Sequence, residues 1–295
     1  RTTGTTKNLK GITYGNNAFV AVGQSGNILT SDNGSSWDNR TSGTSNQLEG
    51  IIYGSNTFVT VGESQTVLTS DNTSTWFARD SGASGTLYGI NYGNSIFITF
   101  QYKTIYTSSD GITWTSPSNG TTNTLRAVAY DGSSTLVAVG FSGTILTSSD
   151  GTTWTSRTSG TSKDINNVHY ADNAFVVVGD NGTVLSSSDG ITWTDETSDC
   201  GAWDNESLWG ITYGNSTWVA NGDNGSIYSY DGSTCTKRTS GTTVEFNELI
   251  YGNSTFVSIG RSGTILTSSD GTTWTQGPPV QQMLSMEMSI LPQKA

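Results

Sequence analysis

Residues 125–157 read LRAVAYDGSSTLVAVGFSGTILTSSDGTTWTSR. Turns rich in Gly, Ser and Asp divide this stretch into four short runs of apolar and β-branched residues: 125–130, 136–140, 144–148 and 154–157. Runs of this length are too short for helices and predict antiparallel strands joined by tight turns. The second run is almost wholly apolar, which is typical of a strand buried on both faces. The pair Ser142-Gly143 suits a two-residue hairpin turn with positive φ angles.

The same pattern recurs along the chain in seven copies. A Tyr closes the first run of each copy: Tyr14, Tyr53, Tyr92, Tyr130, Tyr170, Tyr213 and Tyr251. A Trp follows later in each copy, with Cys235 in its place in the sixth: Trp37, Trp76, Trp114, Trp154, Trp193 and Trp274. A period near 39 residues with four strands is typical of a propeller blade, whereas a β-solenoid usually has shorter repeats. The sequence therefore predicts an all-β, seven-bladed β-propeller over residues 1–276, with four antiparallel strands per blade.

The composition excludes several classes of function. The chain has 295 residues with one His and two Cys, so we expect no metal centre and no cofactor. Its net charge is −11, whereas nucleic-acid binding requires a basic surface, so we expect no nucleic-acid partner. No apolar run reaches about 18 residues and no signal peptide stands at the start, so we expect no membrane insertion. Because the first residue is Arg rather than Met, we expect a processed or excised product.

Residues 30–37, TSDNGSSW, join the third and fourth runs of the first copy. This turn resembles the Asp-box, Ser/Thr-x-Asp-x-Gly-x-x-Trp, of sialidases, xyloglucan-degrading propellers and the photosystem II assembly propeller of plants and cyanobacteria. Most other copies read Ser-Asp-Gly-x-Thr-Trp, one residue shorter between Asp and Trp, and the second copy lacks the Gly. The resemblance implies structural turns that lie away from the ligand-binding face. A row of calcium-binding or catalytic carboxylates is the alternative, but the calcium-binding spacing Asp-x-Asp-x-Asp-Gly does not occur.

Positions that vary while their neighbours recur are released from the packing needs of the blade. One such position lies in the first run of each copy: Lys10, Glu49, Tyr88, Arg126, Asn166, Trp209 and Asn247. These residues follow the loop between blades, which places them around the mouth of the central channel. We predict a ligand-binding ring there, with aromatic faces, charges and amides for a polar ligand. The alternative is a solvated rim that fills unequal gaps between blades.

Two further sets of residues stand out. A second variable position precedes the hairpin turn and is expected on the same face, where an exposed Phe141 beside Arg261 would suit protein contact: Gln24, Glu63, Gln101, Phe141, Asp180, Asp223 and Arg261. An Arg recurs at the end of the fourth run: Arg40, Arg79, Arg157 and Arg238. The resemblance to the photosystem assembly propeller implies partner binding by such arginines. The simpler interpretation is a stem that covers apolar edge surface and a head paired with a nearby acid.

The sixth copy and the C-terminal end depart from the repeat. Cys200 and Cys235 are the two cysteines, both lie in the sixth copy, and we expect a disulfide between them, with Trp203 filling the space of the missing Trp. A disulfide indicates an oxidising compartment and hence a secreted or cell-surface protein. Residues 277–295 alternate with the period of a strand at 284–290. This tail is expected to pair with its own propeller or with a neighbouring subunit, giving self-association, or to be a linker.

The sequence supports an enzyme less well than a binding protein. No Arg is followed by the Ile-Pro of sialidases, and Glu49 is the one acid of the ring, so a pair of catalytic carboxylates is missing. His169 lies in the first run of the fifth copy and is expected to pack there. The sequence therefore favours a non-catalytic, extracytoplasmic binding scaffold for a protein partner at the channel mouth. A carbohydrate-binding propeller, a structural or adhesive subunit assembled through its C-terminal strand, and a glycosidase remain the alternatives.

Overall fold

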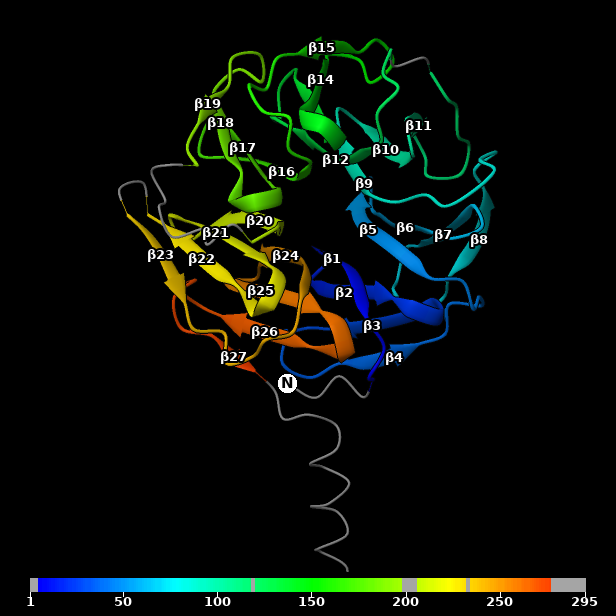
Figure 1. Cartoon of the computed structure of the whole chain (residues 1–295). Helices are drawn as coiled ribbons and strands as arrows, with labels where there is room; N and C mark the ends of the chain where they lie inside the picture. Colours follow the sequence, from blue (N-terminus) through cyan, green and yellow to red (C-terminus); the bar gives the residue numbers. More distant parts are fainter. Residues whose placement is uncertain (1–4, 118–119, 198–205, 232–233, 277–295) are drawn as a thin grey trace, which may run out of the picture.

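The computed structural model describes residues 5–117, 120–197, 206–231 and 234–276. Their strands form seven antiparallel sheets, arranged as blades around a central axis (Figure 1). The first strand of each blade contacts the first strands of both neighbouring blades, so these strands form a closed ring. The predicted seven-bladed β-propeller is confirmed.

The blades follow one another along the chain. Blade one contains β1 (Leu9–Gly15), β2 (Ala18–Gly23), β3 (Asn27–Ser31) and β4 (Asp38–Arg40); blade two contains β5 (Leu48–Gly54), β6 (Thr57–Gly62), β7 (Thr66–Ser70) and β8 (Phe77–Asp80). Blade three contains β9 (Ile90–Gly93), β10 (Ile96–Gln101) and β11 (Thr104–Ser108); blade four contains β12 (Leu125–Tyr130), β13 (Leu136–Gly140), β14 (Thr144–Ser148) and β15 (Thr155–Arg157). Blade five contains β16 (Ile165–Ala171), β17 (Ala174–Gly179), β18 (Val184–Ser187) and β19 (Thr194–Asp195). Blade six contains β20 (Leu208–Gly214), β21 (Thr217–Gly222), β22 (Ile227–Tyr230) and β23 (Cys235–Arg238); blade seven contains β24 (Phe246–Gly252), β25 (Thr255–Gly260), β26 (Ile265–Ser268) and β27 (Thr275–Gln276).

Blade three departs from the four-stranded pattern. Its sheet has three strands, and a single bridge between Thr107 and Thr115 stands where the fourth strand pairs in the other blades. Pro117 follows this bridge at the position where Arg157 ends β15. Because proline has no N–H to donate to a neighbouring strand, the fourth strand does not extend.

The hairpin between the second and third strands is one residue longer than predicted. In blade one, Gly23 pairs with Asn27, which leaves the three-residue loop Gln24–Gly26. Ser25 and Gly26 have the predicted positive φ angles, 57° and 68°. Four other blades carry the same short 3₁₀ turn: η2 (Phe141–Gly143), η3 (Asp180–Gly182), η4 (Asp223–Gly225) and η5 (Arg261–Gly263), with η1 (Gln24–Gly26) in blade one. The second variable position is therefore the first residue of the loop in these five blades, whereas in blade three Gln101 is the last residue of β10 and pairs with Thr104.

The turn before the recurring Trp is held by its own side chains. In blade three, the Gly111 amide donates to Ser108 Oγ at 2.9 Å, and the Ile112 and Thr113 amides donate to Asp110 Oδ1 at 2.8 Å each. Trp114 Nε1 closes the turn by donating to the carbonyl of Gly111. The carboxylate is thus used inside its own turn. Among the residues that the structure describes, no group of three or more His, Cys, Asp or Glu could hold a metal ion.

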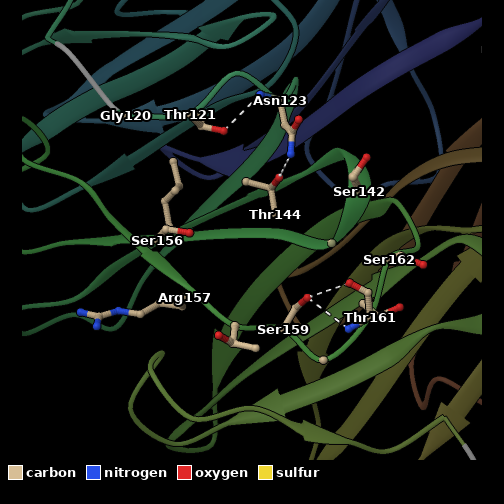
Figure 2. A pocket seen from close by; sticks show the side chains of 14 residues that line it. Gly120, Thr121, Asn123, Ser142, Thr144, Ser156, Arg157, Ser159, Thr161 and Ser162 are labelled. Atoms are coloured by element: carbon tan, nitrogen blue, oxygen red, sulfur yellow. Dashed lines mark hydrogen bonds between the residues drawn. The ribbon is translucent and has the colours of Figure 1, made fainter.

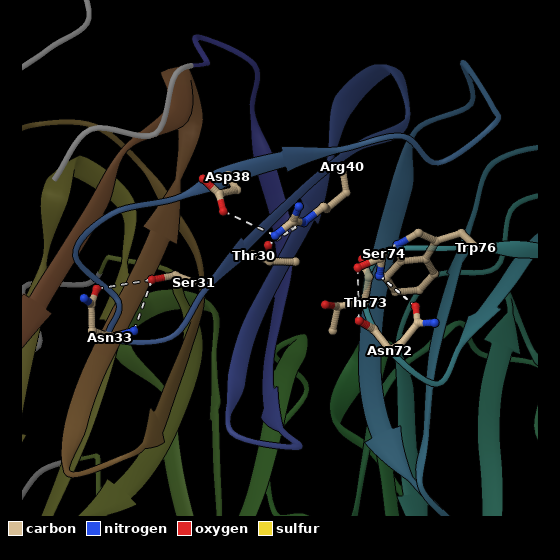
Figure 3. Close-up of polar contacts among 9 residues, drawn as sticks. All are labelled: Thr30, Ser31, Asn33, Asp38, Arg40, Asn72, Thr73, Ser74 and Trp76. Atoms are coloured by element: carbon tan, nitrogen blue, oxygen red, sulfur yellow. Dashed lines mark hydrogen bonds and ion pairs between the residues drawn. The ribbon is translucent and has the colours of Figure 1, made fainter.

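The first two blades build this turn with asparagine. Asn33 Oδ1 accepts from the amides of Ser35 and Ser36, at 2.7 and 3.2 Å, and Asn72 takes the same role in blade two (Figure 3). Asn33, and not Asp32, is therefore equivalent to Asp110. The length difference expected between the first copy and the others is wrong, because Asn33 and Asp110 both precede their Trp by four residues.

The recurring Tyr explains part of the repeat. In six blades the Tyr packs on an aromatic ring at the start of the next strand, as Tyr53 does on Phe58 with ring centroids 4.6 Å apart, whereas Tyr130 of blade four is followed by Leu136. Tyr53 also covers Gly15 of the preceding blade, where an added Cβ would lie 2.2 Å from the ring. The buried clusters accordingly join neighbouring blades, including blades one and seven. Asn247 Nδ2 donates to the carbonyl of Leu9 at 2.7 Å across that junction, so the ring closes without exchange of a strand.

The recurring Arg at the end of the fourth strand pairs mainly with a hydroxyl group. Nε of Arg40, Arg79 and Arg157 donates to a Thr on the third strand at 2.8–2.9 Å, and Arg238 donates to Ser229 at 2.7 Å. An acidic partner is present for Arg40 alone of the four within the described ranges, where Asp38 lies at 3.2 Å (Figure 3). The predicted pairing with an acid is thus wrong for the other three, because the Thr or Ser hydroxyl lies closer along the strand.

Two predictions fall outside the described residues. Cys200 and Trp203 lie in the segment 198–205, so the Cys200–Cys235 disulfide stays a prediction; Cys235 itself packs beside the cluster that contains Tyr228 and Leu208. The tail 277–295 is also outside. In the described part of the chain, no helix has the length and apolar character to span a bilayer.

Candidate binding site at the channel mouth

All seven residues of the predicted ring line one cavity of about 770 Å³ in the central channel. In six blades the register of the first strand shifts at this residue, between Leu9 and Gly11 in blade one and at the equivalent positions of the others. A β-bulge leaves its extra residue unpaired and turns its side chain away from the ladder. In blade three, Tyr88 precedes β9. In the other six blades the ring residue pairs with no neighbouring strand and is free to vary, whereas the Tyr88 amide donates to the carbonyl of Phe100 at 2.9 Å.

The side chains of the ring are partly shielded from solvent. Asn166 is buried and the other six side chains are half-buried. Two of the amides join neighbouring blades: Asn166 Nδ2 donates to the carbonyl of Leu208 at 2.9 Å, and Asn247 makes the bond to Leu9 described above. Glu49 accepts from Gln47 Nε2 at 2.5 Å. The amides therefore serve the closure of the ring, whereas the aromatic and charged members face the cavity.

The second variable position meets the ring, as predicted, in blades four, five and six. Asn166 Nδ2 donates to Asp180 Oδ1 at 3.0 Å, and Trp209 Nε1 donates to Asp223 Oδ1 at 2.7 Å. Phe141 is half-buried and stacks with Arg126. We expected Arg261 beside Phe141, and this is wrong: Arg261 forms an ion pair with Glu245 at 2.9 Å.

Arg126 is held between two aromatic rings. Its guanidinium carbon lies 4.5 Å from the centroid of Phe141 and 5.1 Å from that of Trp209, which comes from blade six. Burial lowers the pKa of Arg126, while the carboxylates of Asp164 and Asp180 act in the opposite direction. Its buried Nε has no hydrogen-bond partner, and none of the described carboxylates lies within 4 Å. The guanidinium stays charged and can still take an anionic group.

Tyr102 is a member of the site that the sequence did not indicate. It follows Gln101 in the hairpin of blade three, has a positive φ of 50° and is 56% exposed. Its ring meets Tyr88 edge-on, with centroids 5.8 Å apart. An aromatic residue in a loop that otherwise holds polar residues was the available signal. Together, Tyr88, Tyr102, Arg126, Phe141 and Trp209 form what we call the mouth cluster.

His169 packs inside the channel wall, as predicted. Its ring meets Trp218 edge-on at 5.8 Å, and burial lowers its pKa to about 4. The imidazole is therefore neutral at pH 7. None of the described hydrogen bonds joins it to a serine and a carboxylate as a catalytic triad requires.

A second cavity, of about 470 Å³, is lined by η2, β14 and β15 of blade four and by the loops that precede and follow this blade (Figure 2). Hydroxyl groups line it, and several of them bond to a side-chain amide or to the backbone: Asn123 Nδ2 donates to Thr144 Oγ1 at 2.8 Å, and Ser159 Oγ donates to the Thr161 carbonyl at 3.1 Å. Ser42 and Ser240 form the equivalent hydrogen bond after blades one and six, each donating to the carbonyl two residues further on. The bond of Ser159 is thus part of the repeated architecture of the blades.

Fold and cavity define the chain as a seven-bladed β-propeller with its non-repeating residues at the channel mouth. It is similar to the solved structure of YCF48 bound to D1 peptide, at 17% identity and a TM-score of 0.72, over 92% of this chain and 94% of that one. YCF48 from Cyanidioschyzon merolae matches at 16% identity and 0.71, over 89% and 95%. The WD40 propeller of Doa1 matches at 10% identity and 0.71, over 92% and 94%. No family model and no curated protein sequence matches the chain, so the likeness concerns the fold.

Proposed function

We propose that this protein is a non-catalytic binding scaffold that recognises a protein partner through the mouth cluster. The observation that carries the proposal is the convergence of residues that the seven blades do not share, including a guanidinium clamped by two aromatic rings without an acidic partner. The fold is similar to that of a propeller solved with a bound peptide, which supports the proposal of a protein partner.

The chemistry of the cluster suits an extended peptide segment. A cavity of about 770 Å³ accommodates a few side chains and is too small for a folded element. Tyr88, Tyr102 and Trp209 offer aromatic faces to apolar side chains, which is how binding hot spots are usually built. Arg126 offers the N–H groups that its stacking leaves free to a carboxylate of the partner.

Three finer points belong to this proposal. The resemblance of the Trp turns to the Asp-box is supported by their internal hydrogen bonds. A secreted or cell-surface location rests on the predicted Cys200–Cys235 disulfide, and the native mass of the protein tests it: two free thiols would remove the argument. Self-association through residues 277–295 is tested by sedimentation, because deletion of these residues should then leave a folded monomer.

The test compares capture of partners by three forms of the protein. Wild type is compared with Arg126→Met, which keeps an apolar stem between the two rings but removes the charge. Arg157→Met is the matched control, because it changes an Arg on an outer strand. A protein that binds wild type and Arg157→Met, and binds Arg126→Met at least tenfold more weakly, supports the proposal. Equal capture by all three forms would refute it, and binding to a glycan array that Trp209→Ala abolishes would favour a carbohydrate-binding propeller.

A further inference from the structure

The position after the ring residue in each first strand is small in five blades and polar in two: Gly11, Gly50, Gly89, Ala127, Asn167, Gly210 and Glu248. Close approach of neighbouring first strands explains the small residues. A Cβ added at Gly11 would lie 2.9 Å from the Cα of Gly50, and one added at Gly210 would lie 2.8 Å from the amide of Leu249. Asn167 and Glu248 are thus exceptions that packing of the blades does not require.

These two exceptions contact each other across blade six. Asn167 Nδ2 donates to the carbonyl of Trp209 at 3.0 Å and to Glu248 Oε1 at 3.3 Å, passing over Gly210. The amide of Leu249 also donates to Glu248 Oε1, at 3.1 Å. Both donors therefore hold the same oxygen of the carboxyl group. Among the described residues, Glu248 Oε2 has no donor, and no Lys or Arg nitrogen lies within 4 Å of it.

Glu248 and Asn167 line the same cavity as the mouth cluster, one residue further along the strand than the ring. Burial of the carboxyl group raises the pKa of Glu248 to about 7. The residues in contact with Glu248 carry no charge: Asn167 from blade five, and Gly210 and Asn221 from blade six. His169, which lines the same cavity, is neutral at pH 7 because its pKa is about 4. The cations that line this cavity are Lys10 and Arg126 of the ring, and neither pairs with Glu248.

We propose that Glu248, positioned by Asn167, forms a second binding site inside the channel, which takes a primary ammonium group on an apolar stem. A half-buried carboxylate with one oxygen unpaired can accept a charge-assisted hydrogen bond, and a primary ammonium group supplies N–H donors for it on a compact head. A divalent metal needs several oxygen ligands, and the described residues supply no such group. The apolar stem fits the wall, to which Ile12, Ile51 and Ile211 contribute.

The probe is propylammonium, with 1-propanol as the neutral control, and binding is followed by NMR through the side-chain amide of Asn167 and the indole of Trp209. Glu248→Gln keeps an oxygen for both donors and removes the charge. We expect its affinity for propylammonium to fall at least tenfold, while Glu196→Gln, which neutralises an acid outside the cavity, stays within twofold of wild type. Glu49→Gln tests whether the acid of the ring is the site instead. Thermal unfolding of each variant shows that the fold is retained.

Wild type alone provides a second measurement. Because propylammonium keeps its charge up to about pH 10 while Glu248 ionises near pH 7, affinity should rise about tenfold between pH 6 and pH 8. A role of Glu248 in bracing the blades would change unfolding and leave this affinity untouched. The proposal is overturned if propylammonium gives no saturable shift, if 1-propanol binds equally well, or if Glu49→Gln is the variant that abolishes binding. No partner protein enters this experiment, so its outcome is independent of the proposed function.

Discussion

The turn before the recurring Trp offers a graded test of its structural role, because its donors and acceptors differ in burial. Ser108→Ala removes the acceptor of the Gly111 amide, which is buried. Leaving a buried N–H without a partner costs about 1–3 kcal/mol. Asp110→Ala removes the acceptor of two exposed amides, those of Ile112 and Thr113, which resembles the loss of a helix cap and costs about 0.5–2 kcal/mol.

Asp110→Asn is the decisive variant. Asn33 and Asn72 perform this role in blades one and two, so an amide oxygen is sufficient to accept both bonds. We expect a loss below about 0.5 kcal/mol for Asp110→Asn. The order of stability is therefore wild type, Asp110→Asn, Asp110→Ala and then Ser108→Ala, measured as the midpoint of urea unfolding by circular dichroism. If Asp110→Asn were as damaging as Asp110→Ala, the charge and not the geometry would matter, and the argument would fail.

Acid provides the control for the charge. The amides of Thr113 and Ile112 lower the pKa of Asp110 below its ordinary value of 3.8. The ionised carboxylate therefore contributes its full stabilisation above that value and loses it as the pH falls through the lower pKa of the folded state. The advantage of wild type over Asp110→Asn should shrink in acid, and an advantage that grows in acid would contradict this assignment.

Three further predictions concern the channel. Arg126→Met should leave the urea midpoint unchanged or raise it, because the lost Nε has no hydrogen-bond partner, and a clear fall would show that the clamp stabilises the fold. Gly11→Ala should destabilise by about 1–3 kcal/mol, since its Cβ would lie 2.9 Å from the Cα of Gly50; Gly85→Ala, whose φ is not positive and whose Cβ would meet only the flexible side chain of Gln101, is the control and should cost less. His169, with a folded pKa of about 4 against 6.5, should make wild type lose stability as the pH falls from 6.5 to 4, and His169→Gln should not show this loss in thermal unfolding.

The strands could be predicted because seven copies repeat the same local signals. In blade four, three of the four predicted runs match β12, β13 and β14 at both ends, and β15 begins one residue later than expected. Where a single copy departs from the others, the prediction was weaker. The pyrrolidine ring of Pro117 stops the fourth strand of blade three, and Asn33 replaces the carboxylate in the turn of blade one, so the residue type alone misaligned that copy.

The sequence by itself indicated the seven residues of the ring, because their position varies among copies whose neighbouring positions recur; it did not indicate Tyr102 or the contact between Asn167 and Glu248. Only the tertiary structure decided what these residues do to one another. Arg126 reaches from blade four to Trp209 in blade six, and Asn167 reaches from blade five to Glu248 in blade seven. Both contacts pass over the blade between, and they depend on the diameter of the closed ring. That diameter follows from the packing of all seven first strands together, which no single copy contains.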